Sequence, residues 1–251
     1  MLIVEDLKVK LGDKEILKNI NLEIKQGETH ILFGPNGSGK TSLLMTIMGY
    51  PQYRVVCGKI TFKGEDITHM NINERAELGI GMSYQRPPSI NGLKTRQMIQ
   101  ICSHNGVDVE DLAARVNFTD FLERDINVGF SGGEIKRSEL LQLLAQDPDL
   151  MLFDEPESGV DLENIALIGN TINLLLQRDL HATEEKSKKQ LVKERTKMGL
   201  IITHTGFILD YVSADKGQVL YDGVLACRSY PAEIFRQIKD VGYEECVRCV
   251  L

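Results

Sequence analysis

The sequence contains no tryptophan, and phenylalanine and tyrosine raise its aromatic share to only 6%. It has five cysteines, an odd number without the density of a disulfide scaffold, which favours the reducing cytoplasm. No apolar run reaches the length of a membrane-spanning helix, and the first ten residues do not form the apolar stretch of a targeting signal. The formal net charge of −7 lacks the basic excess typical of nucleic-acid-binding proteins. We therefore expect a cytoplasmic protein with no direct membrane insertion and no nucleic-acid partner, although docking onto a separate membrane protein is not excluded.

Strand and helix patterns alternate along the 251 residues, which predicts an α/β fold. Short apolar runs broken by turn residues indicate antiparallel strands in residues 2–28 and a strand pair in residues 58–68. Residues 74–145 have a mostly helical pattern. The apolar runs in DLMLFDEP and GLIITH predict buried strands, and Asp222-Gly223 predicts a hairpin turn. Between these runs, one face of a predicted helix carries Ile165, Ile168, Ile172 and Leu175.

The segment GPNGSGKT, from Gly34 to Thr41, fits the phosphate-binding P-loop pattern between a predicted strand and a predicted helix. Glycines allow backbone N–H groups to surround the phosphates, and the positive end of the helix dipole favours the anion. Lys40 would reach the β- and γ-phosphates, and the hydroxyl of Thr41 would ligate Mg²⁺. A chance glycine turn is the weaker interpretation, because the strand-loop-helix context is the one that the motif requires.

The run LMLFDEP, from Leu150 to Pro156, predicts a buried strand that delivers carboxylates at its C-terminal end. Asp154 would contact the metal, as the Walker-B aspartate does in P-loop enzymes. Glu155 is the candidate general base that activates the attacking water. Solvated acids at a strand end are the alternative, which the P-loop upstream makes the weaker one.

A second glycine pair stands in FSGGEIKR, where Gly132 and Gly133 follow Ser131 and precede a helical pattern. Taken with GPNGSGKT, Gln85, LMLFDEP, the SGVD of residues 158–161 and His204, these motifs occur in the order typical of an ABC-type ATPase. The sequence resembles that family over nearly its whole length.

The resemblance implies a P-loop NTPase of the ABC-ATPase type, an α/β fold with a mixed sheet core, an antiparallel β subdomain and an inserted α-helical subdomain. Residues 1–251 would form a single ABC ATPase domain. The core and β subdomain would occupy about 1–85 and 146–251, and the helical subdomain with the signature motif would occupy about 86–145.

The resemblance also implies two chains arranged head to tail in an ATP-dependent dimer. The signature segment of each chain would then close over the ATP that is held by the P-loop of the other. Gln85 would touch Mg²⁺ and water, and His204 would contact the γ-phosphate, so the expected metal contacts are Thr41, Gln85 and Asp154 and the catalytic residues Glu155, His204 and Gln85. The residues expected to contact ATP are Gly34, Pro35, Asn36, Gly37, Ser38, Gly39, Lys40, Thr41, Ser42, Ser131, Gly132, Gly133 and Asp161.

Within this family the sequence is most similar to the SufC group, the ATPases of the Suf iron–sulfur cluster assembly system. Three segments carry this likeness: MGYPQYRVVCGKITFKGEDI, INVGFSGGEIKRSELLQ and LDYVSADKGQVLYDG. The likeness implies a SufB- or SufD-like scaffold protein as partner. An aromatic side chain that many ABC ATPases stack on adenine is absent, and Leu11 or a neighbouring aliphatic would take its place, so we expect weak ATP affinity.

Three functions follow from these motifs. The favoured one is Mg-dependent ATP hydrolysis that drives conformational change in an iron–sulfur scaffold. The alternative is the ATPase subunit of an ABC transporter, and a non-hydrolysing switch is disfavoured by the presence of Glu155.

Two segments depart from the SufC pattern. The charged residues 181–198 are interpreted as a solvated helix or linker rather than a docking arm. Cys246 and Cys249 are interpreted as thiols of a surface tail, with a redox pair or half of a shared metal site as alternatives.

Overall fold

The computed structural model of the chain describes residues 1–103, 106–178 and 193–248. Most of the charged segment 181–198 and Cys249 therefore lie outside the described residues. The strands of the described part are β1 (Leu2–Leu11), β2 (Lys14–Ile24), β3 (Thr29–Phe33), β4 (Tyr53–Phe62), β5 (Glu65–Asp66), β6 (Ile80–Ser83), β7 (Leu150–Asp154), β8 (Met198–Ile202), β9 (Lys216–Tyr221) and β10 (Val224–Ser229). Its helices are α1 (Lys40–Met48), α2 (Ile72–Glu77), α3 (Thr95–Cys102), α4 (Val109–Arg115), η1 (Thr119–Phe121), α5 (Gly132–Gln146), α6 (Leu162–Leu175), η2 (Phe207–Asp210) and α8 (Pro231–Val247).

In the described part of the chain the strands form one sheet in the order β5-β4-β1-β2-β10-β9-β3-β8-β7-β6. The β5-β4-β1-β2 part is antiparallel, whereas β9, β3, β8, β7 and β6 are parallel to one another. The antiparallel β9-β10 hairpin, which turns at Asp222-Gly223 as predicted, joins the two parts. This mixed α/β sheet confirms the predicted fold class.

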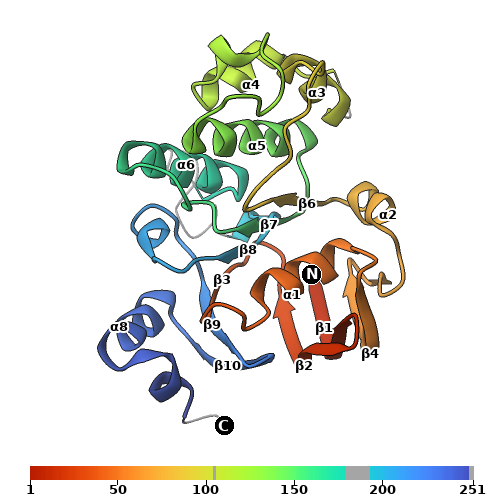
Figure 1. Cartoon of the computed structure of the whole chain (residues 1–251), viewed down its shortest axis with the longest axis vertical. Helices are drawn as coiled ribbons and strands as arrows, with labels where there is room; N and C mark the ends of the chain where they lie inside the picture. Colours follow the sequence, from red (N-terminus) through yellow and green to blue (C-terminus); the bar gives the residue numbers. More distant parts are fainter. Residues whose placement is uncertain (104–105, 179–192, 249–251) are drawn as a thin grey trace.

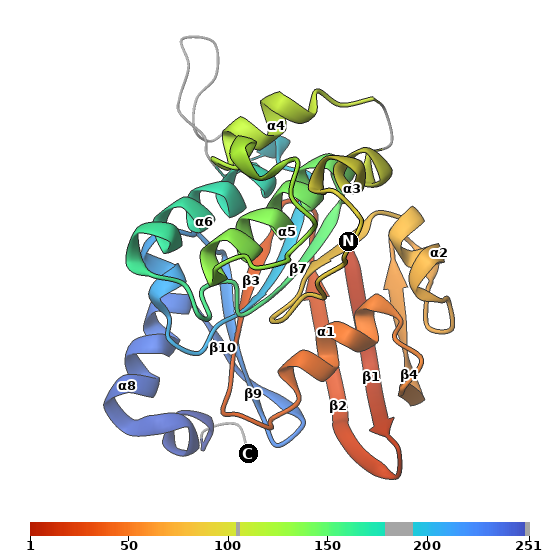
Figure 2. The same cartoon turned by 45° about the horizontal axis from the view of Figure 1, so that its top comes forward.

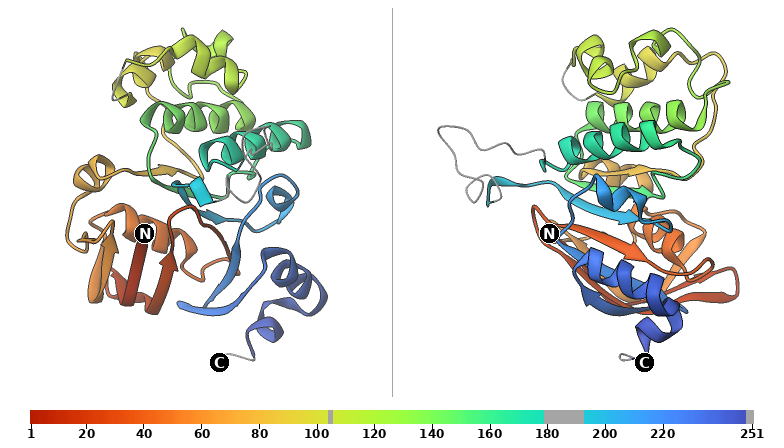
Figure 3. Two further views of the ribbon diagram at one scale, coloured as in Figure 1. Left: turned by 180° about the vertical axis from the view of Figure 1, so that it is seen from behind. Right: turned by 90° about the vertical axis from the view of Figure 1, so that its left-hand side faces the viewer.

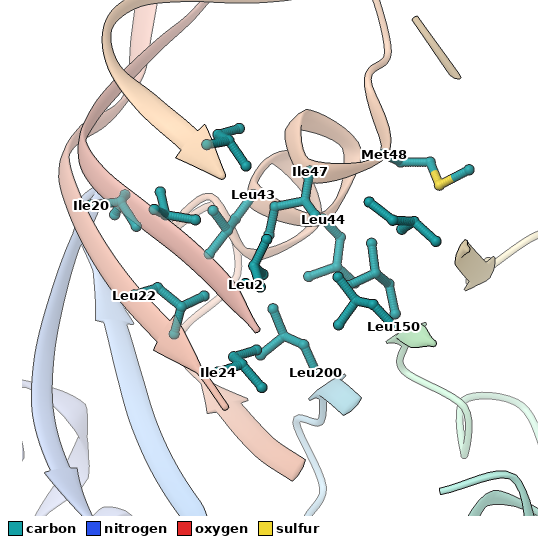
Figure 4. Packing of buried hydrophobic residues seen from close by; sticks show 14 of the residues in the cluster. Leu2, Ile20, Leu22, Ile24, Leu43, Leu44, Ile47, Met48, Leu150 and Leu200 are labelled. Carbon is teal, nitrogen blue, oxygen red and sulfur yellow. The ribbon is translucent and has the colours of Figure 1, made fainter. Parts of the chain in front are cut away.

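Apolar side chains from both parts of the sheet and from α1 belong to one buried cluster. Figure 4 shows residues of β1 and β2 pointing toward Leu43, Leu44 and Ile47 of α1, with Leu150 and Leu200 of the parallel strands alongside. All three α1 side chains are fully buried. Burying a leucine or isoleucine side chain stabilises a fold by about 1.5–3 kcal/mol. The helix that begins at Lys40 is therefore held firmly against both parts of the sheet.

Helices α3, α4 and α5 gather at one end of the molecule, away from β1, β2 and β4 (Figures 1 and 3). They share a separate apolar cluster that includes Ile99, Phe118 and Leu141. Helix α5 lies beside α6, which covers the parallel strands (Figure 2). The predicted apolar face of α6, with Ile165, Ile168, Ile172 and Leu175, is buried. Whether residues 86–145 behave as a separate subdomain stays a prediction.

Residues 80–83 form strand β6, so the prediction of a mostly helical pattern from residue 74 onward is wrong at this point. All four residues of IGMS are buried, and the strand pairs in parallel with β7. Four residues are too few to show a strand period, and the pairing depends on β7, which lies far along the chain.

The C-terminal residues form helix α8, which is kinked at Gly242 and packs beside β9 and β10 (Figure 1). Cys246 in its last turn is only 3% exposed, and its carbonyl oxygen accepts a hydrogen bond from Cys227 Sγ at 2.7 Å. A position on a surface tail is therefore wrong for Cys246. Among the described residues, no group of three or more histidine, cysteine or acidic side chains is arranged to hold a metal ion. Within the same ranges, no helix combines the length and apolar character that crossing a membrane requires.

Candidate active site

The P-loop lies between the end of β3 at Phe33 and the start of α1 at Lys40. A Cβ atom on Gly34 would stand 2.2 Å from the carbonyl oxygen of Leu220, so only glycine fits there. The N-terminus of α1 has no side-chain cap, and its backbone N–H groups are therefore available for an anion. Ser38 is buried, and its Oγ has no hydrogen-bond partner among the described residues. Pro35, Asn36, Gly37 and Gly39 complete the loop, and Thr41 and Ser42 follow Lys40 in the helix.

Lys40 folds back onto the loop that precedes it. Its Nζ donates to the carbonyl oxygens of Gly34 at 2.8 Å and Pro35 at 2.9 Å, and the residue is 5% exposed. Burial lowers the pKa of Lys40 to about 8, although Glu155 and Asp154 act in the opposite direction. The ammonium group thus replaces only part of its hydration with two carbonyl contacts, which a phosphate could displace.

Asp154 ends strand β7 and is 1% exposed. Its Oδ1 accepts a hydrogen bond from Thr41 Oγ1 at 3.3 Å, whereas its Oδ2 is buried without a partner in the described part of the chain. Burial raises the pKa of Asp154, and the nearby Glu155 adds to this effect, whereas Thr41, Lys136 and Lys40 lower it. A buried carboxylate oxygen without a partner beside a threonine hydroxyl is a donor set that suits Mg²⁺.

Glu155 stands at the centre of a cluster at the C-terminal ends of three adjacent parallel strands. Its Oε2 accepts from Gln85 Nε2 at 2.7 Å, and its Oε1 lies 2.5 Å from His204 Nε2. Gln85 follows β6, Glu155 follows β7 and His204 follows β8, so the strand register brings the three residues together. Burial lowers the pKa of His204, Lys40 lowers it further, and Glu155 opposes both.

The segment from Ser131 to Gly133 starts helix α5. The Ser131 side chain accepts from the N–H of Glu134, and Glu134 Oε2 accepts from the N–H of Ser131 at 2.7 Å, which together form a capping box. A Cβ atom on Gly132 would stand 2.2 Å from the carbonyl oxygen of Gly159, and one on Gly133 would stand 2.8 Å from Cγ of Asn164. This glycine pair is thus explained by close packing inside the chain.

Asp161 caps the N-terminus of α6. Its two carboxylate oxygens accept from the backbone N–H of Asn164 at 2.9 Å and from Asn164 Nδ2 at 2.8 Å. These hydrogen bonds lower the pKa of Asp161. Within the described ranges no hydrogen bond joins Ser131 or Asp161 to the P-loop, so the structure does not bring these two predicted residues to the cluster around Glu155. Their contacts with nucleotide stay predictions.

Two buried charges of helix α5 hold the segment that carries Gln85, and sequence reasoning missed both. Lys136 Nζ donates to the carbonyl oxygens of Tyr84 and Gln85, the latter at 3.3 Å. Glu139 accepts from the N–H of Tyr84 at 2.7 Å and from Ser83 Oγ at 3.0 Å. Lys136 and Glu139 are 3% and 5% exposed. A lysine and a glutamate three residues apart on the inner face of a helix were the available signal.

A family model described as "ABC transporter" matches residues 17–158. The chain belongs to the ABC transporter family. It is similar to "Probable ATP-dependent transporter ycf16" of Cyanidium caldarium, at 35% identity over 97% of this chain and 95% of that protein. It is also similar to "Probable ATP-dependent transporter SufC" of Escherichia coli (strain K12), at 32% identity over 97% of both chains.

Solved structures agree with the fold of this ABC ATPase. A nucleotide-free ATP-binding cassette from an ABC transporter superimposes with a TM-score of 0.78, covering 98% of both chains at 20% identity. A bacterial Atm1-family ABC exporter with ATP bound gives a TM-score of 0.76, where this chain covers 42% of the exporter chain at 20% identity. The predicted resemblance to ABC ATPases of the SufC type is confirmed. Membership of the family also identifies the chain as an ATPase.

Proposed function

We propose that the chain hydrolyses ATP in a Mg²⁺-dependent reaction and uses it to change the conformation of an iron–sulfur cluster assembly scaffold. The observation that carries the hydrolytic part is the position of Glu155. It lies directly after the buried Asp154 and is held from two sides by Gln85 and His204, at 2.7 and 2.5 Å.

Nucleotide binding would begin at the P-loop. The N–H groups at the start of α1, which no side chain caps, would bind phosphate oxygens, and Ser38 Oγ, which has no partner among the described residues, would join them. Lys40 would exchange the carbonyl oxygens of Gly34 and Pro35 for the β- and γ-phosphate oxygens. The exchange is favourable because a charge-assisted hydrogen bond to phosphate is stronger than one to a neutral carbonyl.

Thr41 and Asp154 would hold Mg²⁺, and Gln85 would contact it once its amide leaves Glu155. The unpartnered Oδ2 of Asp154 and its Oδ1 beside Thr41 fit this role. Bound Mg²⁺ supplies charge neutralisation for the phosphates and the leaving group.

Glu155 would orient the attacking water and accept its proton. Burial and the nearby Lys40 lower the pKa of His204, which favours the neutral imidazole, and a ring N–H of His204 would donate a hydrogen bond to the γ-phosphate. In the structure both side chains contact each other, and phosphate binding would require His204 to turn from Glu155 toward the nucleotide.

The second half of each site would come from another copy of the chain. Ser131 and the N–H groups of Gly132 and Gly133 lie at the exposed N-terminus of the 15-residue helix α5. In a head-to-tail dimer they would meet the γ-phosphate held by the partner's Lys40, with Asp161 close by. The packing of Gly132 against Gly159 would couple the signature segment to the turn that follows Glu155.

The scaffold partner is supported by similarity to the protein named SufC and by the three SufC-like segments. Both relatives are named as probable ATP-dependent transporters, which supports the alternative, the ATPase subunit of an ABC transporter. Affinity purification from native cells separates the two. A co-purifying SufB- or SufD-like scaffold supports the proposal, whereas a polytopic membrane protein without such a scaffold supports transport. Mg-dependent ATP hydrolysis that is lost in Glu155→Gln tests the catalytic part independently.

A further inference from the structure

Glu157 is a third acid beside the catalytic cluster that the motifs leave without a role. It follows Glu155 by two residues in the turn between β7 and α6 and is only 5% exposed. Its Oε2 is buried and has no hydrogen-bond partner among the described residues. Burying a carboxylate oxygen without a hydrogen-bond partner lowers the stability of the folded state. Residues with such unfavourable environments are found more often at functional sites than elsewhere.

The other carboxylate oxygen collects two hydroxyl groups from the segment after β8. Oε1 of Glu157 accepts from Thr203 Oγ1 and from Thr205 Oγ1, the latter at 3.2 Å. These threonines are the immediate neighbours of His204 on its two sides. A hydroxyl has one proton to donate and lone pairs to accept, so each threonine can also bind the backbone.

Both threonines do so. Thr203 Oγ1 accepts from the N–H of Gly206 at 3.0 Å, and Thr205 Oγ1 accepts from the N–H of Phe207 at 3.3 Å. The turn that carries His204 is therefore held by two threonine hydroxyls, and both of them donate hydrogen bonds to Glu157. Because one oxygen holds both neighbours, the peptide groups on either side of His204 cannot rotate independently.

Glu157 also fixes this turn relative to Glu155. The two glutamates share the turn after β7, where the N–H of Ser158 donates to the carbonyl oxygen of Glu155 at 3.0 Å. Glu155, Glu157, His204 and Thr205 line one side of a cavity of about 300 Å³. The contacts of Glu157 with Thr203 and Thr205 therefore form a second link between the two turns that the His204–Glu155 contact of 2.5 Å also joins.

We infer that Glu157 is a positioning residue for the hydrolysis reaction, which holds the turn that carries His204 through Thr203 and Thr205, so that the imidazole can turn from Glu155 to the γ-phosphate. The inference rests on the catalytic role proposed for His204. A displacement of about 1 Å in a reacting group can cost on the order of a hundredfold in rate. Loss of this link should therefore lower kcat and leave ATP binding, which uses the P-loop, unchanged.

The experiment compares steady-state ATP hydrolysis by Glu157→Met, Glu157→Gln and Thr205→Val. Methionine has a similar length but no acceptor, so kcat should fall roughly tenfold or more, with KM within about twofold. Glutamine keeps a carbonyl oxygen that can accept from both threonines, so it should restore most of kcat. Thr171→Val is the matched control, because Thr171 is also buried but its hydroxyl bonds the carbonyl oxygen of Leu167.

A double-mutant cycle separates a positioning role of Glu157 from a purely structural one. If Glu157 acts through the threonine, adding Thr205→Val to Glu157→Met should lower kcat no further. Additive losses, an unchanged kcat in Glu157→Met, or a rise in KM equal to the fall in kcat would each overturn the inference. Should Glu157→Met fail to fold, Thr205→Val alone carries the test, and a kcat equal to that of Thr171→Val would overturn it. If His204→Ala and Glu155→Gln lose activity but Glu157→Met stays active, this inference alone is wrong. If all three variants keep normal activity, the proposed function is wrong.

Discussion

The proposed ATP-driven dimer can be tested by one charge placed at Ser131. The background is Glu155→Gln, which keeps the size of the side chain but removes the water-activating carboxylate, so that ATP persists. In this background Ser131→Asp and Ser131→Asn form a matched pair. Asparagine and aspartate both cap helices about as well as serine, and the side chain of Ser131 caps α5 by accepting from the N–H of Glu134. Neither variant should therefore unfold the start of α5.

The two variants differ in charge. In the proposed dimer residue 131 faces the γ-phosphate held by the partner's Lys40. Two negative charges ~4 Å apart at an effective dielectric constant of 20 repel by about 4 kcal/mol. This repulsion corresponds to roughly a thousandfold in the dissociation constant for one site, and the dimer carries it at two sites, so the dimer should weaken by more than a thousandfold. The loss of a cap, by comparison, costs about 1 kcal/mol of monomer stability.

Sedimentation with and without Mg-ATP is the assay. Glu155→Gln and its Ser131→Asn derivative should dimerise when ATP is added, and the Ser131→Asp derivative should stay monomeric. ATP binding to the monomer should be equal in all three, because no hydrogen bond joins Ser131 to its own P-loop in the described part of the chain. An ATP-driven dimer of normal strength in the aspartate variant would refute the placement of Ser131 at the γ-phosphate.

Three further outcomes are expected. The dissociation constant for ATP should rise as pH increases through about 8, because burial lowers the pKa of Lys40 to about 8 and the bound phosphates need the charged ammonium. A dissociation constant that stays the same up to pH ~9.5 would contradict this. Leu11→Tyr should tighten ATP binding by up to roughly 1–3 kcal/mol, measured by calorimetry, since Leu11 is 40% exposed and an aromatic ring can stack on adenine; unchanged affinity would place the base elsewhere. Gly132→Ala should lower the free energy of unfolding by about 1–3 kcal/mol in urea titrations, because the new Cβ would stand 2.2 Å from the carbonyl oxygen of Gly159; a neutral result would contradict this packing.

The fold could be predicted where its signals are local. The apolar runs of β7 and β8 and the Asp222-Gly223 turn are visible within a few residues, and each lies where the sequence predicts. Strand β6 and helix α8 were missed for different reasons. Strand β6 is short and is defined by its pairing with β7, whereas α8 has charged residues throughout and a glycine at its kink, which weakened its helical pattern.

The motifs named residues of the candidate site but not the contacts that hold them. Gln85, Glu155 and His204 were predicted one by one, and the structure brings them together because β6, β7 and β8 are neighbours. Glu157 could not be recognised in the same way. Its partners stand 46 and 48 residues further along the chain, and a buried glutamate has no local signature that separates it from a solvated one.

The two glycine runs of the chain look equivalent in sequence but have different physical causes. Gly34 is needed inside the P-loop, where a side chain would collide with Leu220. Gly132 is needed because Gly159 of the same chain approaches it, so no phosphate is required to explain a glycine at that position. Substitution of Gly132 therefore cannot distinguish a second ATP contact from internal packing. Ser131 can, because its side chain is exposed and its one structural task, capping α5, is also performed by asparagine and aspartate.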